Sequence, residues 1–496
     1  MVTPCPVDLE ALFTDPGAVG RPLCVDLDGT LVTTDTLAES VMRLLRRAPW
    51  AIVRLLTLVA SPVRFKTRVA GGVQLDPEKL PYRGELVSAL RACREQGRSV
   101  VLATAAHRSI AEGVAGHLGI FDAVHASDAT RNLKSASKRD VLVAAYGKNG
   151  FDYVGDSTAD IAIFAAANRG YLIGASRSAE SEARTAGNVK VISRRPSPLP
   201  AAWKELRPHQ WSKNALVVVP LLLAPGALTW SSVACAAAAF IAFSCCASAG
   251  YVINDVVDID ADRVHRTKFR RPFASGDLPI AYAPFLVFAL VVASLGLALG
   301  FLPTRFIVML GAYFVATLTY SFYLKRLLLL DVLTLAGLYT HRILSGGVAT
   351  RVPVSAWLLG FSMFLFTSLA FAKRYVELRA ATTDEKVKSR GYVRQDIEMV
   401  NSMGVASAYV AALVFMLYVD SSAVRSIYRL PTMLWLVLPI LLYWLGRIWL
   451  LAGRGQMQDD PVRFAIKDGQ SRACAILIAM IMAIARFAPR GLFGAT

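Results

Sequence analysis

Two aspartates in the stretch LCVDLDGTL, near the N-terminus, are spaced so that their carboxylates could serve one reaction centre. Asp26 and Asp28 follow an apolar run that predicts a β-strand, and open α/β sheets bind ligands in the loops after their strands. An aspartate pair also occurs in ordinary turns. The stronger signal is the ordered set of polar residues that follows: Thr104 ending VVLAT, Lys138 in SASKRDVL, and Asp156 and Asp160 in YVGDSTADIAIF.

This ordered set resembles the phosphatase branch of the haloacid dehalogenase superfamily, over most of residues 20–195. The resemblance implies that Asp26 is a nucleophile forming an aspartyl-phosphate and that Asp28 is a general acid and base. Thr104 and Lys138 would hold the phosphoryl oxygens, with Lys134 as the rival lysine. Mg²⁺ would be bound by a carboxylate set of Asp26, Asp28, Asp156 and Asp160. An inactive scaffold or regulatory domain is the alternative, and the complete set of residues argues against it.

A basic and apolar insert, RLLRRAPWAIVRLLTLVASPVRFKTRVA, lies between the first two motifs. The resemblance implies that residues 37–80 form a helical cap that selects the substrate. The insert fits a pair of cap helices with a solvated charged face. It also fits an amphipathic helix on an anionic membrane surface, which we favour because the remainder of the chain is apolar.

A second group of carboxylates lies in YVINDVVDIDADRVHRTKFRRP. On a helix, Asp255, Asp258 and Asp262 share one face, whereas Asp260 points elsewhere and is expected to be solvated. Like charges on one face repel each other unless a cation lies between them. Mg²⁺ bridging a diphosphate would satisfy them. Cationic candidates for the phosphates follow directly: Arg263, Arg266, Lys268, Arg270 and Arg271.

Composition divides the 496 residues into two parts. Residues 1–194 alternate five apolar strands (PLCVDLD, RSVVLATA, DAVHAS, FDYVGD and RGYLIGA) with helical stretches, which predicts an α/β domain with a parallel sheet. Residues 195–204 (RPSPLP and its neighbours) predict a linker, and residues 205–496 contain about nine apolar runs of roughly 18 to 22 residues, long enough to span a bilayer. The chain is 55% hydrophobic, with a mean hydropathy of +0.45. We see no signal peptide, and the scattered cysteines indicate a reducing compartment.

The distribution of positive charge predicts which side of the membrane the loops occupy. The formal net charge is +18, but no nucleic-acid-binding motif accompanies it, and membrane proteins concentrate Lys and Arg in cytoplasmic loops. Loops 253–282, 323–328, 373–401 and 453–472 hold clusters of Lys and Arg, whereas the opposite side has only scattered arginines such as Arg305, Arg351, Arg425 and Arg429. We therefore expect an inner-membrane protein whose phosphatase domain and charged motifs lie on the cytoplasmic side.

NDVVDIDAD, with the predicted spans, resembles the first motif (NDxxDxxxD) of the UbiA superfamily of intramembrane prenyltransferases, over residues 205–490. The second DxxxD motif of most members is missing from FAKRYVELRAATTDEKVKSRGYVRQD, which puts a prenyl diphosphate substrate in doubt. LRPHQWSKNALVVVPLL, YSFYLKRLLLLD and DDPVRFAIKDGQSR resemble the decaprenyl-phosphate phosphoribosyltransferase branch. The resemblance implies a Mg²⁺ site at Asp255, Asp258 and Asp262, and substrate contacts from Lys213, Asn254, Lys325, Lys373, Arg374 and Glu377.

The expected fold is therefore a Rossmann-like haloacid dehalogenase domain with a helical cap, followed by an all-α UbiA-type bundle of about nine transmembrane helices. Our hypothesis is a two-step enzyme that transfers 5-phosphoribose from phosphoribosyl diphosphate to polyprenyl phosphate. It then removes the 5-phosphate, giving polyprenyl-phosphoryl-ribose for cell-envelope glycans. The alternatives are an aromatic prenyltransferase with an accessory phosphatase, and a transporter of a lipid intermediate, against which the lack of an internal repeat argues.

The sequence leaves the lipid chain length, the glycan acceptor and the oligomeric state open, a homo-oligomer included. It also does not indicate whether the intermediate passes directly from one site to the other.

Overall fold

The computed structural model describes residues 8–14, 20–48, 50–58, 61–265, 267–380, 391–457 and 461–488. The chain divides into two compact units. The first combines Met1–Leu206 with Tyr251–Phe288, and the second combines Arg207–Gly250 with Ala289–Thr496. The aspartate-rich stretch thus belongs to the same compact unit as the N-terminal α/β domain. The domain boundaries expected from the sequence, at residues 194 and 204, stay a prediction.

A six-stranded parallel sheet forms the centre of the first unit, in the order β3-β2-β1-β4-β5-β6. The five strands expected from the sequence are present, and β6 is an additional short edge strand. The chain builds outward from β1 on one side and then returns to pair β4 with its other side. This reversal places a ligand-binding crevice beyond the carboxyl ends of β1 and β4. The strands are β1 Leu23–Val25, β2 Val100–His107, β3 Ala123–Ser127, β4 Asp152–Gly155, β5 Gly170–Leu172 and β6 Val189–Val191.

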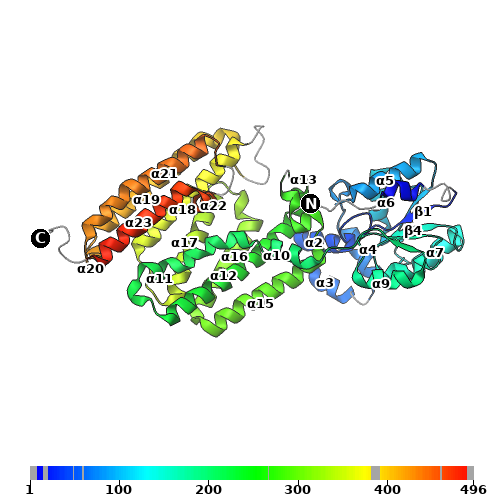
Figure 1. Ribbon diagram of the computed structural model, residues 1–496, viewed down its shortest axis with the longest axis horizontal. Coiled ribbons are helices and arrows are strands. Elements are labelled where there is room, and N and C mark those ends of the chain that lie inside the picture. The colour runs from blue at the N-terminus through cyan, green and yellow to red at the C-terminus, as the bar shows by residue number, and fades with distance from the viewer. Residues whose placement is uncertain are drawn as a thin grey trace. The chain divides into compact units, whose positions relative to one another are not determined.

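Helices cover both faces of this sheet, with α5 and α6 on one side and α7 and α9 on the other (Figure 1). Alternate residues of β1 explain the two layers, because Leu23 and Val25 pack into one buried cluster and Cys24 into the other. The covering helices are α1 Leu9–Phe13, α5 Gly84–Glu95, α6 Arg108–Leu118, α7 Ala136–Tyr146, α8 Ile161–Phe164 and α9 Arg177–Ala186. The α/β fold expected for the N-terminal part is confirmed.

Two further groups of helices complete the first unit. The insert between β1 and β2 forms α2 Thr36–Arg47, α3 Ala51–Leu58 and α4 Pro62–Gly72, followed by the 3-10 turn Pro77–Lys79. Helix α10 Pro198–Glu205 follows β6. The aspartate-rich stretch contributes the end of α12 Trp230–Val257, then α13 Ile259–Val264, the turn Lys268–Arg270, α14 Pro272–Ser275 and the turn Ile280–Tyr282.

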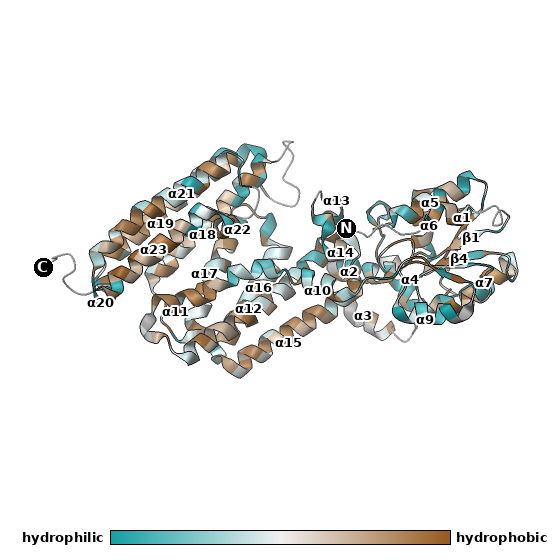
Figure 2. Cartoon of the chain, in the orientation of Figure 1, coloured by the Kyte–Doolittle hydropathy of each residue, from teal (hydrophilic) through white to brown (hydrophobic). Residues whose placement is uncertain are grey.

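Long helices make up the second unit, and most are hydrophobic along their length (Figure 2). They are α15 Ala283–Phe301 (which begins in the first unit), α16 Thr304–Phe322, α17 Leu330–Thr350, α18 Ala356–Arg379, α19 Ile397–Asp420, α21 Val437–Gly453 and α23 Gly469–Phe487. Shorter elements are the 3-10 helix η4 Pro208–Val218, α11 Val219–Leu223, α20 Ser422–Ile427 and α22 Pro461–Lys467.

Seven helices in the described part of the chain are long and apolar enough to cross a membrane, fewer than the nine segments expected. One of the expected spans begins near residue 214, and in the structure it is broken into η4 and α11. Helix α17 has the length, 21 residues, but it buries Asp331 and Arg342, which lower its hydropathy. The helical character of this half is confirmed, and its polar interior residues explain the smaller number of spans.

The buried ion pair between Arg98 and Asp152 gives a stability prediction for the first unit. Their closest atoms are 2.5 Å apart, and both side chains are almost fully buried. Replacing Arg98 with Met leaves the Asp152 carboxylate buried without its counter-charge, so we expect a loss of about 3–5 kcal/mol in the free energy of unfolding. Pulse proteolysis of the full chain in urea measures it. Arg184→Gln, which breaks an exposed pair with Glu180, is the control and should cost far less.

Candidate active sites

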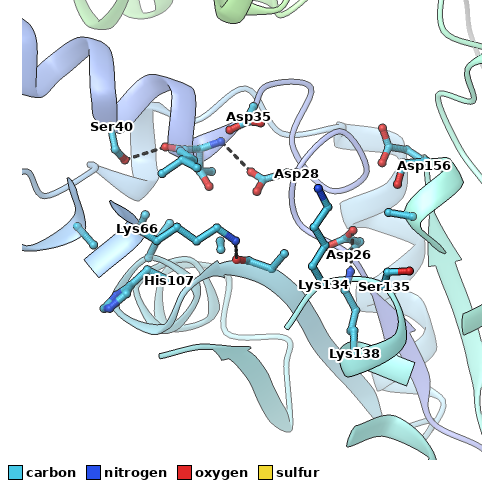
Figure 3. A pocket seen from close by; sticks show the side chains of 18 of the residues that line it. Asp26, Asp28, Asp35, Ser40, Lys66, His107, Lys134, Ser135, Lys138 and Asp156 are labelled. Atoms are coloured by element: carbon cyan, nitrogen blue, oxygen red, sulfur yellow. Dashed lines mark hydrogen bonds and ion pairs between the residues drawn. The ribbon is translucent and has the colours of Figure 1, made fainter. Parts of the chain in front are cut away.

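The predicted nucleophile and metal ligands meet beyond the carboxyl ends of β1 and β4. Asp26 follows β1, Asp156 follows β4, and Asp160 ends the 3-10 turn after it. One carboxylate oxygen from each lies within 4.8 Å of the others, and all three residues are buried. They line a cavity of about 270 Å³ together with Asp28 and Lys138 (Figure 3). Residues more than one hundred positions apart are thus brought together as the motif order implies.

Lys138 neutralises part of this negative charge. Its Nζ lies 2.9 Å from Asp26 Oδ2 and 3.5 Å from Asp160 Oδ1, and it donates to the Tyr153 hydroxyl at 2.8 Å. Burial lowers the pKa of Lys138, but the charges of Asp26 and Asp160 outweigh burial and leave the pKa raised. The rival, Lys134, also lines the cavity, but only Lys138 is paired with the predicted nucleophile among the described contacts.

Asp28 has the environment of a proton donor. Its Oδ1 accepts a hydrogen bond of 2.7 Å from the backbone N–H of Thr36, at the start of α2. Burial and then the neighbouring Asp35 charge raise the pKa of Asp28 to about 8. A carboxylic acid that keeps its proton near neutral pH can protonate a leaving alkoxide. The neighbouring Asp26, whose pKa is raised by burial to about 6 and held down by Lys138, ionises first.

The structure does not place Thr104 as expected. Its side chain is fully buried, its Oγ1 accepts a hydrogen bond from the Ala106 N–H, and it is not among the residues that line the cavity. The wall at this point consists of Ala105, Ala106 and His107. The residues immediately after Thr104, rather than Thr104 itself, therefore line the cavity.

Two cations at this site were not among the expected site residues. Lys66, from cap helix α4, lines the cavity and donates to the Ala105 carbonyl at 2.6 Å and to Asn132 Oδ1 at 2.8 Å. Arg195, from the expected linker, lies 2.7 Å from Asp156 Oδ2. Burial lowers the pKa of Lys66. The basic insert hinted at Lys66, but no local pattern marks either residue, because each partner is distant in sequence.

The carboxylates fit a divalent cation. Burial, followed by the charges of Asp26 and Asp160, raises the pKa of Asp156 to about 7. Oxygen-rich, mutually repelling carboxylates are the donor set that Mg²⁺ prefers. Asp160 is held in place by three donors on one oxygen, the N–H groups of Asp156 and Ser157 and the Ser157 hydroxyl. Asp26 and Asp156 would therefore be the direct ligands, with Asp160 in support.

A glycine follows the nucleophile's strand where no larger residue fits. Gly29 has a left-handed backbone, with φ of +76°, and a Cβ at this position would collide with the Asp156 carboxylate. The Arg83 guanidinium donates to the Gly29 carbonyl at 3.0 Å. This close approach brings the loop after β1 against the loop after β4.

The aspartates of the second motif do not lie on one continuous helix. Helix α12 ends at Val257 and Asp258 caps the start of α13, which corrects the expectation of a single helical face. Asp255 and Asp262 are nevertheless brought together, because Arg271 Nη1 is 3.0 Å from Asp255 and also pairs with Asp262. Burial raises the pKa of Asp262, an effect that Arg271 opposes. Two buried carboxylates sharing one cation form a site suited to positive charge.

Most of the cations expected beside these aspartates are either paired with other residues or exposed. Arg263 is buried against Glu39 of α2, with nitrogen–oxygen distances of 2.6 and 3.1 Å, so the structure uses it within the protein rather than leaving it open to a phosphate. Asp260, expected to be solvated, pairs with Arg43 of α2. Lys268 and Arg270 are exposed, Asn254 is half-buried, and Arg266 lies outside the described residues.

One of the expected cations of the second unit, Arg374, belongs to a buried network. Arg374 Nε is 2.5 Å from Asp331, its Nη1 is 2.5 Å from Glu377, and its Nη2 donates to the Tyr320 hydroxyl at 3.2 Å. The Tyr392 hydroxyl donates to Asp331 at 2.8 Å. Asp331 was not expected in a site, although it ends the quoted stretch YSFYLKRLLLLD. Lys325 is buried, Lys373 is half-buried, and Lys213 lies 5.7 Å from the Tyr339 ring.

Metal binding at the first site should depend on pH. A carboxyl group whose pKa is raised by folding binds its proton more tightly in the folded state, so stability falls as pH rises from 3.8 to about 6 for Asp26 and to about 7 for Asp156. Mg²⁺ binds the ionised carboxylates and offsets this loss. We expect saturating Mg²⁺ to raise the unfolding temperature of the full chain more at about pH 8 than at about pH 5. Asp156→Asn should lose most of this difference, and equal shifts at both pH values would contradict the prediction.

The contact between α2 and α13 gives a second prediction. Glu39 and Arg263 are 1% and 6% exposed, so removing either leaves an uncompensated buried charge. We expect Glu39→Gln and Arg263→Met each to destabilise the first unit, and the double variant to recover part of the loss, with an interaction energy of about 0.5–3 kcal/mol. Pulse proteolysis of the full chain measures the cycle, and additive losses would show that the two side chains do not interact.

Comparison with known proteins finds a matching family for each half of the chain. Residues 215–482 match the UbiA prenyltransferase family, and residues 63–165 match the haloacid dehalogenase-like hydrolases. The chain is 37% identical over 470 residues to the uncharacterized protein y4nM of Sinorhizobium fredii, covering 94% of this chain and 91% of that protein. It is 32% identical over 279 residues to the nodulation protein NoeC of Azorhizobium caulinodans, covering 55% and 89%.

A third relative has a named enzymatic activity. The chain is 37% identical over 196 residues to the decaprenyl-phosphate phosphoribosyltransferase of Mycobacterium tuberculosis, covering 38% of this chain and 65% of that enzyme. The match thus takes in less than two thirds of the enzyme's length. The UbiA match covers more than half of this chain and contains most of the candidate spans. The chain therefore belongs to the UbiA prenyltransferase family, as a multi-pass membrane protein that carries an additional haloacid dehalogenase-like domain at its N-terminus.

Proposed function

We propose that this protein is a two-step membrane enzyme that makes polyprenyl-phosphoryl-ribose. The observation that carries the proposal is the arrangement of Asp26, Asp28, Lys138 and Asp156 around one cavity, in a chain related to decaprenyl-phosphate phosphoribosyltransferases. A transferase of that kind leaves a phosphomonoester on its lipid product, and the cavity has the groups that hydrolyse such an ester.

The first step is a pentosyl transfer. An oxygen of the polyprenyl phosphate attacks the anomeric carbon of phosphoribosyl diphosphate, and the bond from that carbon to the diphosphate breaks. Asp255, Asp258 and Asp262 would hold Mg²⁺, which neutralises the departing diphosphate. Lys213, Lys325 and Lys373 are the candidate phosphate contacts. Arg374 and Glu377 were also expected to contact the substrate, but in the structure they pair with each other, and Arg374 also pairs with Asp331.

The second step is a phosphomonoester hydrolysis. Asp26 attacks the 5-phosphate of the lipid-linked ribose, and Asp28 gives its proton to the departing ribose oxygen. Asp28, now ionised, takes a proton from a water molecule that attacks the aspartyl-phosphate and releases inorganic phosphate. Lys138 stabilises the charge on the phosphoryl oxygens and keeps Asp26 ionised. Mg²⁺ at Asp26 and Asp156 would add further positive charge.

The presence of both activities in one chain favours the proposed order of the two steps. The product of the first step stays in the bilayer, and joining both sites in one chain raises the local concentration of that product at the second site. In this proposal both sites face the cytoplasm of a cell with an inner membrane, and the product is a pentose donor for cell-envelope glycans. The positive charge of the loops supports this sidedness.

Product analysis tests both steps together. Membranes containing wild-type protein or Asp26→Asn receive labelled phosphoribosyl diphosphate, polyprenyl phosphate and Mg²⁺, and the lipids are resolved by mass. We expect lipid-linked ribose from the wild type and the same lipid with one additional phosphate from the variant. Asp258→Asn should give neither, and it controls for carry-over of label.

Other outcomes would point elsewhere. If neither protein places ribose in the lipid fraction, the phosphoribosyl step is wrong. Transfer of label from a prenyl diphosphate to an aromatic acceptor would then support the second candidate, an ordinary prenyltransferase, which the family match favours. Identical lipids from wild type and Asp26→Asn would exclude the phosphatase step alone.

A further inference from the structure

Helix α17 carries a buried positive charge, Arg342, with no carboxylate beside it among the described residues. Arg342 is 5% exposed, lies in the middle of the helix, and has no carboxylate partner among the residues that the structure describes. Its three hydrogen bonds go to neutral oxygens: Nε to the Asn214 side-chain carbonyl at 2.9 Å, Nη1 to the Leu338 carbonyl at 2.7 Å and Nη2 to the Tyr313 hydroxyl at 2.7 Å. The guanidinium is therefore held in place but not neutralised.

Arg374, in the same unit, is a buried arginine that does have carboxylate partners. Arg374 is equally buried, and it lies against the carboxylates of Asp331 and Glu377. Asp331 is on the same helix as Arg342, but eleven residues away, which is about 16 Å along the helix. A charge inside a membrane bundle is costly and is retained where it has a partner or a function.

The surroundings of Arg342 hold it rigidly. The Tyr313 and Tyr339 rings lie 4.8 and 5.4 Å from the guanidinium carbon, close enough for cation–π attraction. Asn214 is itself fixed, because its amide nitrogen donates to the Ser244 hydroxyl at 3.1 Å. Elements η4, α12, α16 and α17 thus meet at one guanidinium, and none of them contributes a negative charge.

Capacity for a ligand remains. A guanidinium has five N–H groups, and three are used by the neighbours named above, so two on its outer nitrogens have no partner among the contacts of the described residues. A second cation contacts the same ring, since Lys213 Nζ lies 5.7 Å from the Tyr339 ring centroid and the Arg342 guanidinium carbon lies 5.4 Å from it. A rigid fork of N–H groups matches the oxygens of a phosphate better than it matches a single acceptor.

We infer that Arg342, together with Lys213, forms an anion site that binds a phosphate group of a substrate of the membrane half. The inference rests on the proposed function for the identity of that substrate, and it assigns to Arg342 a role that the aspartate motif does not supply. The phosphate belongs either to the lipid or to the diphosphate of the sugar donor. These share one chemistry, and separate probes distinguish them.

Asn214→Asp is the decisive variant, because it gives Arg342 a permanent internal counter-charge. If Arg342 serves only as a structural tie, the new ion pair should leave ligand binding unchanged. If Arg342 binds a phosphate, the same substitution should weaken that binding while the protein stays at least as stable as the wild type. Arg342→Lys, which keeps the charge and loses the fork, should weaken binding as well.

The experiment uses the full chain in detergent, with inorganic diphosphate and a short polyprenyl phosphate as separate probes. Binding is followed by the shift in unfolding temperature over a titration of each probe. We expect one of the probes to stabilise the wild type, and the dissociation constant for that probe to rise about tenfold or more in both variants. Arg447→Lys is the matched control: Arg447 is paired with Asp468 at 2.7 and 3.0 Å, and the lysine keeps that pair.

Each outcome of the binding experiment either supports or overturns the anion site. Unchanged binding in Asn214→Asp, no stabilisation of the wild type by either probe, or a marked loss of stability in Asn214→Asp would each overturn the inference. Tenfold weaker binding in a stable Asn214→Asp protein would support it, and the responding probe identifies the source of the phosphate. The ribose-transfer assay is independent: if no ribose is transferred but the probe result holds, the anion site stands and the proposed substrate fails.

Discussion

Negative charge crowded beyond the carboxyl ends of β1 and β4 is the constraint on which the candidate active site of the first unit depends. Asp26, Asp156 and Asp160 are buried within a few ångströms of each other, and nearby cations are needed to keep such carboxylates ionised, because burial and like charges raise their pKa. Lys138 supplies one from α7, and Arg195 supplies another from the segment after β6. The topology of the sheet brings the loops after β1 and β4 to one edge. The attraction between their carboxylates and the two cations then determines where Lys138 and Arg195 lie.

The other carboxylates of the chain follow the same rule with different cations. Asp255 and Asp262 share Arg271, whereas Asp331 is paired with Arg374. In each case a guanidinium lies where two negative groups converge, and its planar fork can satisfy both. Arg342 is the converse, a cation whose neighbours are all neutral. Charge balance, more than hydrophobic packing, distinguishes the functional parts of this protein from its scaffold.

Local sequence patterns account for much of the fold and for the candidate catalytic aspartates. Five of the six strands and most long helices follow from runs of apolar residues, and Asp26, Asp28 and Asp156 stand at the ends of two of those strands. Such residues are found because strand and motif lie together in sequence. Pairs such as Glu39 with Arg263, 224 residues apart, have no local signature, because only the tertiary fold brings them together. Thr104 shows the same limit: it lies inside β2, which continues to His107, and its Oγ1 accepts a hydrogen bond from the Ala106 N–H. The direction of this hydroxyl did not follow from its place in the motif.

The discontinuity of the first unit has a consequence for biosynthesis. Its sheet and cap are complete by residue 206, but the unit also contains Tyr251–Phe288, and α2 keeps Glu39 and Arg43 for ion pairs with α13. A ribosome delivers those partners only after it has made all of α12, which is apolar and long enough to span a membrane. The first unit therefore reaches its final packing only after a membrane-length helix has been made, which couples completion of the N-terminal domain to synthesis of the membrane half.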